Sequence, residues 1–445
     1  MRNPVRIIGA GLAGSEAAWQ CARRGIPVEL FEMRPVRSTP AHQTADFAEL
    51  VCSNSLKSET ENTAPWLLKE EMRRAGSLLM EIARQCCVPA GHALAVDRMT
   101  FATKVTDAIS QEPLVTIRRE EVTHIAEDEI TVLATGPLTS DTLSLEIARL
   151  SGSSRLYFFD SISPIVEAES IDLSKVYRAA RYDKGSADYI NCPMSKEEYD
   201  RFYDELISAE SVEQRDWEKL NYFEGCLPIE EIARRGRDTL RFGPMKPVGL
   251  KDPRTGTMPH AVVQLRQENL RADSYNLVGF QNHLKFGEQA KVLRLIPGLE
   301  NACFLRYGQI HRNTYINAPT LLSETLQMKA HPTILFAGQI CGVEGYVESI
   351  ATGLMAGVYA SALANGGELI PAPRASAFGS LIHYITGSDP SRFQPANMTF
   401  DLLPALASRI RERQQRHKLQ CELALREFDH WLAAVNRARA TELAS

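Results

Sequence analysis

The sequence lacks the patterns that mark several large classes of protein. Its nine cysteines are scattered and never form CxxC or a Cys/His cluster, so neither a disulfide framework nor a zinc site is expected. No apolar run approaches the roughly 18 residues that a membrane span requires, and an apolar strand pattern begins at once, with no signal peptide. Internal repeats and low-complexity tracts are absent. We therefore expect a cytoplasmic protein with no membrane partner, no metal site and no obligate protein partner.

The chain also has little excess of charge of either sign. Its net charge of −5 argues against a protein coated in positive charge but leaves room for a local basic groove. A single hydrophobic core stops growing well below 445 residues, so we expect two domains, or one domain with a large insertion.

What the sequence does contain begins at its first stretch, Val5 to Glu32, which has the order of a βαβ dinucleotide-binding unit. A short apolar run leads into a GxGxxG turn, an Ala-rich helical segment follows, and a second strand ends at Glu32. A carboxylate about 20 residues beyond such glycines accepts hydrogen bonds from a ribose diol. The alternative is a tight turn without a ligand, but the framing by strand, helix, strand and acid favours a bound dinucleotide. The residues expected to hold it here are Gly9, Ala10, Gly11, Leu12, Ala13, Gly14 and Glu32.

Further along the chain, helical and strand patterns alternate. Residues 33–58 read as a loop packed over the cofactor. Helical patterns are expected at Trp66 to Arg84, Arg98 to Ser110, Ser195 to Ser208 and in the tail from Leu402 to Arg439. Strands are expected at Ala93 to Asp97, Leu114 to Ile125, Ile130 to Ala134, His260 to Leu265 and Tyr275 to Phe280.

Two further turns indicate which dinucleotide is bound. Thr135 and Gly136 end a strand in the ATG pattern that recurs in flavin folds, and Thr333 to Ala360 repeats the order of apolar strand, glycine turn and small-residue helix. A late strand and helix that return to complete the fold favour FAD over NAD. The expected contacts of this second turn are Gly338, Gln339, Gly342 and Gly345.

These patterns predict an α/β protein with a Rossmann-type, glutathione-reductase-like FAD-binding fold and an inserted α/β domain. The FAD-binding domain is expected to be discontinuous, at 1–156 and 316–445, with an insertion or substrate domain at 157–315. The insert has no second GxGxxG, and no CxxxxC redox pair is present, so NADPH or NADH is expected to visit the substrate cleft transiently.

Several collinear stretches resemble one family, the folate- and FAD-dependent tRNA (uracil-5-)-methyltransferases, or TrmFO family. They span residues 5 to about 360 and read GAGLAGSEAAWQ, FEMRP, LVCSNSLKS, FEGCLPIEE, FGPMKPVGL, VVQLRQEN, YNLVGFQNHLKFGEQ, HRNTYINAP and FAGQICGVEGYVES. The resemblance implies methylation of the uridine at position 54, in the T-arm of tRNA, at carbon 5. Methylenetetrahydrofolate would supply the carbon and reduced FAD the reducing equivalents, and Arg34 in FEMRP joins the cofactor contacts.

The sequence leaves two other hypotheses about the function open. Flavin proteins that modify wobble uridines share the opening fingerprint and FEMRP, but they carry a long C-terminal helical region, whereas only one polar helical tail is expected here. A flavin-bound RNA-binding or folding factor is the alternative from another class. It is favoured if both functional cysteines prove dispensable.

The chemistry implied by the resemblance needs a thiolate that adds to carbon 6 of uracil, which makes carbon 5 nucleophilic, and a group that accepts the carbon 5 proton. Cys226 is the candidate nucleophile. It follows Gly225 and precedes three arginines whose charge favours a thiolate, although the local pattern also suits a buried cysteine that acts as a small hydrophobe. The resemblance marks Cys52 as the second functional cysteine, as a base or as a partner of the flavin.

Folate needs a stacking surface and hydrogen-bonding groups beside the flavin. His311 is the candidate stacking residue, with Glu344 and Tyr346 as candidate hydrogen-bonding partners of the pterin. Arg306 and Arg312 lie nearby in the sequence for the carboxylates of the glutamate tail.

One segment concentrates positive charge. Residues 232–254 hold seven lysines and arginines against two acids, a local balance of +5, as a strip that guides phosphates should. The candidate RNA contacts are Arg234, Arg235, Arg237, Arg241, Lys246 and Lys251.

Overall fold

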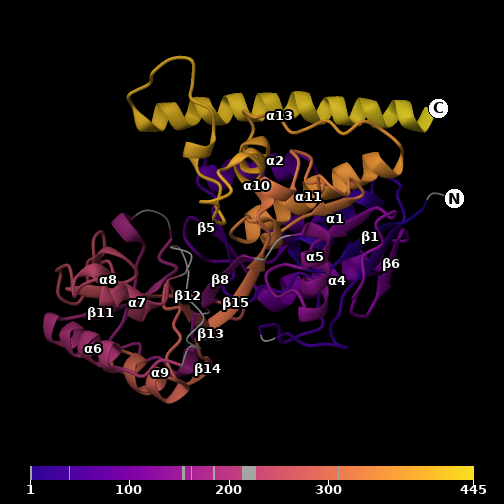
Figure 1. The fold of residues 1–445 in the computed structure, drawn as a ribbon. Helices are drawn as coiled ribbons and strands as arrows, with labels where there is room; N and C mark the ends of the chain where they lie inside the picture. Colours follow the sequence, from indigo (N-terminus) through magenta and orange to yellow (C-terminus); the bar gives the residue numbers. More distant parts are fainter. Residues whose placement is uncertain are drawn as a thin grey trace.

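The structure is a computed structural model that describes residues 3–39, 41–152, 156–161, 163–183, 186–212, 227–308 and 310–444. Figure 1 shows two bodies, each built on its own β-sheet, with a long C-terminal helix lying across the first of them. The N-terminal strand and the C-terminal segments belong to the first body, and the middle of the chain forms the second.

The first body contains a five-stranded parallel sheet. Its order is β16 (Ile334–Phe336), β7 (Thr131–Leu133), β1 (Val5–Ile8), β2 (Val28–Phe31) and β6 (Val115–Arg118). Because the strands are parallel, their carboxyl ends meet at one edge, where the turns after β1, β2, β7 and β16 come together. The predicted return of a late strand to the N-terminal sheet is confirmed by the pairing of β16 with β7.

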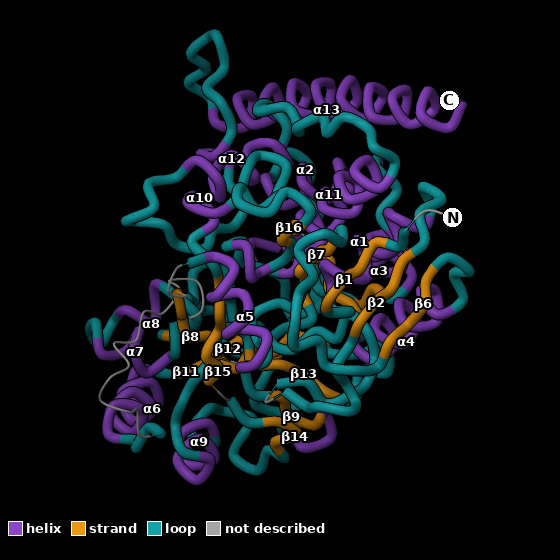
Figure 2. The backbone as a smooth tube through the Cα atoms, turned by 45° about the vertical axis from the view of Figure 1, so that its right-hand side comes forward, coloured by secondary structure: helices purple, strands orange, loops and turns teal. Residues whose placement is uncertain are grey.

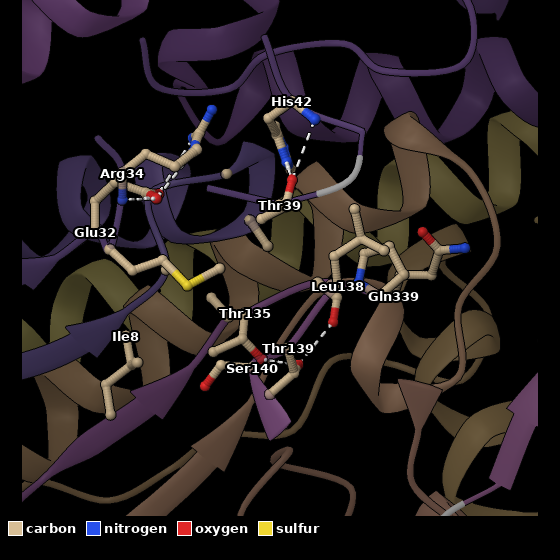
Figure 3. A pocket seen from close by; sticks show the side chains of 18 of the residues that line it. Ile8, Glu32, Arg34, Thr39, His42, Thr135, Leu138, Thr139, Ser140 and Gln339 are labelled. Carbon is tan, nitrogen blue, oxygen red and sulfur yellow. Dashed lines mark hydrogen bonds and ion pairs between the residues drawn. The ribbon is translucent and has the colours of Figure 1, made fainter. Parts of the chain in front are cut away.

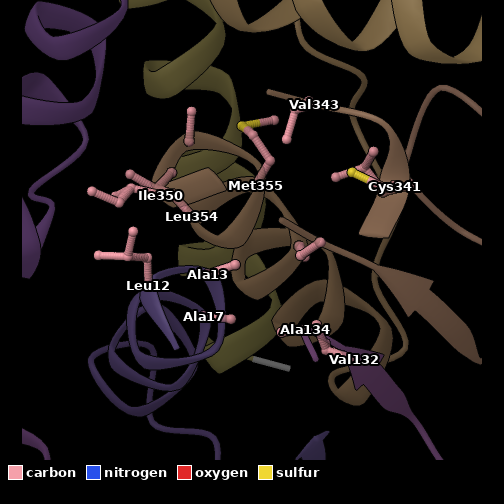
Figure 4. Packing of buried hydrophobic residues seen from close by; sticks show 14 of the residues in the cluster. Leu12, Ala13, Ala17, Val132, Ala134, Cys341, Val343, Ile350, Leu354 and Met355 are labelled. Atoms are coloured by element: carbon pink, nitrogen blue, oxygen red, sulfur yellow. The ribbon is translucent and has the colours of Figure 1, made fainter. Parts of the chain in front are cut away.

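Helices α1 (Leu12–Ala22) and α11 (Tyr346–Ala364) pack directly against each other although more than 300 residues separate them. Figure 4 shows Leu12, Ala13 and Ala17 of α1 on the side of α11 that carries Ile350 and Leu354. The helices approach so closely because a Cβ at Gly353 would lie 2.6 Å from the Ala13 Cα, and one at Gly357 would lie 2.7 Å from the Ala17 carbonyl oxygen. By length and composition α11 is apolar enough to cross a membrane, but 83% of that window is buried inside the protein, as in a core helix.

The remaining elements of the first body surround this sheet. A small antiparallel sheet has the order β3 (Ser55–Ser58), β5 (Ala93–Val96) and β4 (Cys87–Val88). The helices are α2 (Ala64–Arg74), α3 (Leu78–Gln85), α4 (Arg98–Ser110), α5 (Asp141–Ser151), α10 (Ala318–Leu321), α12 (Ala377–Gly387) and α13 (Arg413–Ala444), with short 3-10 turns at Gln339–Cys341 and Phe400–Leu402. Both views place α13 over α2 and α11.

Several predicted boundaries in this body were wrong. The single helix expected at Trp66 to Arg84 is two helices, because Gly76 adopts a φ of +74° and the Ser77 side chain caps α3 by accepting from the Met80 amide. The strand expected at Leu114 to Ile125 ends at Arg118, the loop expected through residue 58 contains β3, and the tail becomes helical only at Arg413.

The second body carries a six-stranded sheet with the order β10 (Tyr177–Arg178), β11 (Ile190–Met194), β12 (Ala261–Gln267), β13 (Ser274–Leu277), β9 (Ile165–Glu167) and β14 (Phe304–Arg306). Every neighbouring pair is antiparallel. The sheet is accompanied by α6 (Lys196–Ser208), α7 (Ile229–Arg234), α8 (Thr239–Phe242) and α9 (Phe286–Leu293), and by 3-10 turns at Ala168–Ser170 and Arg181–Asp183. Helix α6 matches its prediction, since Ser195 and Glu198 form a capping box.

The two bodies have separate hydrophobic cores. The buried apolar cluster of the first draws on residues between 5 and 150 and between 315 and 431, whereas that of the second lies between 166 and 302. A two-stranded antiparallel ribbon, β8 (Leu156–Ser161) with β15 (Ile310–Tyr315), joins them where the chain leaves and re-enters the first body (Figure 2).

The contact between α1 and α11 predicts a specific sensitivity to a single methyl group. Gly353→Ala should lower stability by about 1–3 kcal/mol, because the new Cβ overlaps the α1 backbone and forces the helices apart. Gly287→Ala in α9 is the matched control, since its Cβ meets nothing within 4 Å and alanine favours a helix. Thermal unfolding of both variants measures the difference. Equal melting temperatures would show that the close approach contributes nothing.

Candidate active site

The turn after β1 is shaped by two glycines that tolerate no side chain. Gly9 has a φ of +98°, and a Cβ there would lie 2.6 Å from the Ala134 carbonyl oxygen; a Cβ at Gly14 would overlap the Gly9 carbonyl. Gly11 caps α1 without a side-chain hydrogen bond, and the first turn of α1 carries no acid. The amides at this helix end therefore remain available to an anionic group such as a pyrophosphate.

Glu32, at the end of β2, is held by hydrogen bonds on both carboxylate oxygens. Oε2 accepts from the Ala10 amide at 3.1 Å, and Oε1 accepts from the Arg34 amide at 3.0 Å and from Arg34 Nε at 2.9 Å (Figure 3). Burial alone would raise the pKa of Glu32, but the hydrogen bonds and charge of Arg34 outweigh it, so the pKa is lowered. Glu32 is thus an ionised acceptor, and a ribose diol has to share it with Arg34.

These groups line one large cavity at the carboxyl edge of the parallel sheet, with about 1020 Å³ of space including its open mouth. The residues from the sequence prediction that line it are Gly9, Gly11, Leu12, Ala13, Glu32, Arg34, Thr135, Gly136, Gly338, Gln339 and Tyr346. Ala10, Gly14, Gly342 and Gly345 shape the turns but do not line the cavity. The size is at the upper end for a small-molecule site, as an extended dinucleotide requires.

Sequence reasoning missed several polar residues of this cavity. Thr39 and His42 enter it from the loop after β2, with the Thr39 hydroxyl 2.6 Å from His42 Nδ1, and Thr139 and Ser140 enter it from the turn after β7 (Figure 3). The cluster of hydroxyl residues directly after Thr135-Gly136 was the available signal, because it follows a strand that ends at this edge.

Cys52 lies in a loop that both bodies hold. Arg98 Nη1 donates to the Leu50 carbonyl oxygen at 3.0 Å, and Asn54 Nδ2 donates to the Gln267 carbonyl oxygen at 2.9 Å, at the end of β12 in the second body. Arg266 Nε donates to Asn54 Oδ1 at 2.9 Å. The backbone on both sides of the cysteine is therefore fixed.

Cys52 also differs from the buried cysteines in its surroundings. It is half-buried, and its Sγ lies 3.0 Å from the hydroxyl of Tyr346, which lines the cavity. By contrast, burial raises the pKa of Cys21 to about 11 and that of Cys341 to about 12, so these two are inert thiols.

Two of the residues predicted to bind folate lie at or beside the cavity. Glu344, which is 6% exposed, accepts from Gln339 Nε2 at 3.2 Å and so lies beside the cavity together with Tyr346. His311 lies on β15, opposite Asp160, and its side chain lies outside the described residues. Cys226 also lies outside the described residues.

The basic strip is partly neutralised by acids from inside and outside its own segment. Arg234 pairs with Glu231, Arg241 with Asp238, and Arg237 with both Asp200 and Asp204 of α6. Arg235 is exposed. In the described part of the chain, no carboxylate lies within ion-pair distance of the exposed Lys246 or Lys251. Phe242, which is 82% exposed, lies in the same segment.

The chain matches known proteins over nearly its whole length. A family model described as "Glucose inhibited division protein A" matches residues 4–368. Proteins named "Methylenetetrahydrofolate--tRNA-(uracil-5-)-methyltransferase TrmFO" are 73% identical in Koribacter versatilis, over 97% of this chain and 99% of the relative, and 63% identical in Solibacter usitatus, over 98% and 100%.

A solved structure shares the fold. GidA of Aquifex aeolicus superposes with a TM-score of 0.70 at 18% identity, covering 96% of this chain and 73% of that one. This likeness supports the assignment of a Rossmann-type α/β fold.

The turn after β1 gives a test of cofactor binding. Gly9→Ala should lower FAD occupancy at least about tenfold, because a side chain at this φ is strained and collides with the Ala134 carbonyl. The measurement is flavin absorbance per protein after purification. Gly91→Ala is the matched control, since Gly91 has a similar positive φ of +59° but only Tyr189, at 3.5 Å, near its Cβ. Full flavin content in Gly9→Ala would contradict this account of the turn.

Proposed function

The chain belongs to the methylenetetrahydrofolate–tRNA-(uracil-5-)-methyltransferase family, and we propose that its target is the uridine at position 54, in the T loop. It methylates carbon 5 of a tRNA uridine with methylenetetrahydrofolate as the carbon donor. The single observation that carries this function is 73% identity, over 97% of the chain, to a relative of that name.

The cavity fits FAD. Gly9 and Gly14 let the turn after β1 pack closely against Ala134 and against the start of α1, Glu32 offers an ionised acceptor, and the turns after β7 and β16 complete the walls. The residues that line the cavity and would hold FAD are Gly9, Gly11, Leu12, Ala13, Glu32, Arg34, Thr135, Gly136, Gly338 and Gln339. When bound, FAD supplies the hydride that completes the methyl group.

Two cysteines divide the work on the uracil ring. The Cys226 thiolate adds to carbon 6, so that carbon 5 attacks the methylene carbon of the folate; tetrahydrofolate leaves that carbon after the carbon 5 proton is lost, and the thiolate leaves carbon 6 when the methyl group is completed. The proton on carbon 5 then moves to a base, for which we assign Cys52, because its half-buried sulfur lies beside the cofactor cavity. We assign Glu344 to hydrogen-bond the pterin, Tyr346 to the cavity wall beside it, and His311 to stack on it.

Each of the two bodies has its own hydrophobic core, which supports a division of the chain into two domains. We assign 1–156 and 316–445 to the cofactor domain and 157–315 to the substrate domain. The sequence holds no second GxGxxG, which supports delivery of reducing equivalents by NADPH or NADH from solution. The tRNA substrate and the burial of α11 in the core support a cytoplasmic location.

The direct test is incubation with methylenetetrahydrofolate, NADPH and unmodified tRNA, followed by nucleoside analysis and mapping of the product. We expect 5-methyluridine at position 54. A modified wobble uridine would instead support the second family of flavin enzymes that shares the opening fingerprint. Methylation at another uridine would overturn the assignment of the T loop.

The cysteine roles predict different losses. Cys226→Ala should retain FAD but fail to form a covalent complex with tRNA that carries 5-fluorouridine, since no thiol adds to carbon 6. Cys52→Ala should form the complex but methylate about 10²–10⁴-fold more slowly, as expected when a positioned base is removed. Cys87→Ala, at an exposed cysteine in β4, is the matched control. Normal methylation by a variant that lacks both Cys52 and Cys226 would favour a non-catalytic RNA-binding factor.

The exposed lysines of the basic strip predict a salt effect. Replacing Lys246 and Lys251 with alanine should weaken tRNA binding and reduce the slope of log K against log salt by about 1–2, because each phosphate contact contributes about 0.7–0.9. Lys104→Ala, at an exposed lysine on α4, is the control for loss of a surface lysine outside the strip. Filter binding at several salt concentrations measures both, and an unchanged slope in the double variant would remove these lysines from the interface.

A further inference from the structure

The hydroxyl of Tyr346 is held in an unusual way. Its oxygen accepts hydrogen bonds from the backbone amides of Cys52, at 2.7 Å, and Ser53, at 3.1 Å. The same oxygen lies 3.0 Å from Cys52 Sγ. Tyr346 is the first residue of α11, so the helix that closes the cofactor domain reaches the cysteine loop through this one side chain.

The direction of the contact with sulfur follows from the number of lone pairs. A phenol oxygen has two lone pairs and one proton. Both lone pairs accept amide protons, so the oxygen has no acceptor capacity left for a thiol proton. Its own proton is directed instead to the remaining neighbour, Cys52 Sγ, which makes the sulfur an acceptor.

We propose that Tyr346, anchored by the amides of Cys52 and Ser53, donates its hydroxyl proton to Cys52 Sγ and holds this cysteine as a thiolate in the resting enzyme. Tyr346 is thus a positioning residue that acts through Cys52. The proposal rests on the proposed function, because a resting thiolate is the form that can accept the carbon 5 proton. In that step the C5–H bond breaks, its electron pair stays on the uracil ring, and the proton forms the S–H bond of Cys52.

The charges around the sulfur favour the same state. Arg98 of α4, Arg306 of β14 and Arg266 of β12 lie around the loop, and Glu268 is paired with Arg98 at 2.6 Å. Among these described side chains, three cations and one carboxylate sum to a charge of +2 if Cys52 is a thiol and +1 if it is a thiolate. A thiolate therefore reduces an excess of positive charge in a partly buried site.

Arg266 is hydrogen-bonded to Asn54 and Ser53, whereas Arg306 has fewer partners among the described residues. The guanidinium of Arg306 has neither an ion pair nor a hydrogen bond with any other described residue, and it is half-buried. Burial and the charge of Arg98 lower the pKa of Arg306, whereas Tyr346, Cys52 and Glu268 oppose that shift. Burial, followed by the charge of Cys52, raises the pKa of Tyr346 well above its usual range, so the phenol keeps the proton that it donates.

The test measures the alkylation rate of Cys52 by iodoacetamide against pH in the flavin-loaded protein, with each cysteine resolved by peptide mass spectrometry. Only the thiolate reacts, so the midpoint of the rate profile reports its formation. We expect a midpoint for Cys52 below the value of about 8.5 for a free cysteine. Tyr346→Phe, which keeps the ring and removes the hydroxyl, should raise that midpoint by about one unit, a tenfold change in the thiol–thiolate equilibrium.

Two controls separate this role from a structural one. Tyr359→Phe removes a hydroxyl from the same helix, where it accepts from the Ala372 amide, and should leave the Cys52 profile unchanged. Arg306→Gln removes the positive charge and should raise the midpoint. Arg306→Lys keeps the charge and should leave the midpoint close to the wild-type value. The exposed Cys87 and Cys303 serve as internal references in every variant.

The outcomes distinguish this proposal from the proposed function. A wild-type midpoint near that of a free cysteine, or an identical midpoint in Tyr346→Phe, overturns the proposal whether or not the protein methylates tRNA. A low midpoint that rises in Tyr346→Phe supports it, even if Cys52→Ala proves fully active and the role of Cys52 as base fails.

Discussion

The architecture depends on the contact between α1 and α11, which is closer than a side chain at Gly353 or Gly357 would allow. Helix α1 follows the first strand and α11 follows the last strand of the same sheet, and they touch where Gly353 and Gly357 meet the backbone at Ala13 and Ala17. This contact places the late glycine turn over the first one. Because both turns lie at the carboxyl edge of a parallel sheet, they form two walls of the cofactor cavity, and the chain that leaves the sheet after β7 at Leu133 returns to it at Ile334 of β16.

The parts of the fold that could be predicted were those with local causes. The GxGxxG turn, the capping box of α6 and the return of the late strand each carry a short pattern with a physical reason. The break between α2 and α3 was missed because a helical period continued through Gly76, and one positive φ with one serine cap overrode it. Strand β6 ended early because the alternating pattern continued beyond the residues that pair with β2.

The sequence allowed us to predict which residues belong to the site, but not which of them contact one another. Cys52 and Tyr346 were each singled out, yet nothing in the sequence links positions that lie 294 residues apart, and only the fold brings them to 3.0 Å. The basic strip shows the opposite error. Its charge was counted along the chain, whereas Asp200 and Asp204 reach Arg237 from another helix. Charge that matters for a partner is what remains after such pairing, as at Lys246 and Lys251.

Asn54 connects the loop that carries Cys52 to both bodies. Its amide nitrogen bonds the Val96 carbonyl of the first body at 3.1 Å and the Gln267 carbonyl of the second at 2.9 Å, while its oxygen accepts from Arg266. One side chain thus hydrogen-bonds a sheet of each body from the same short segment. The segment that carries the sulfur is therefore hydrogen-bonded to both sheets at once. The position of the Cys52 thiol therefore depends on how the two bodies are held together.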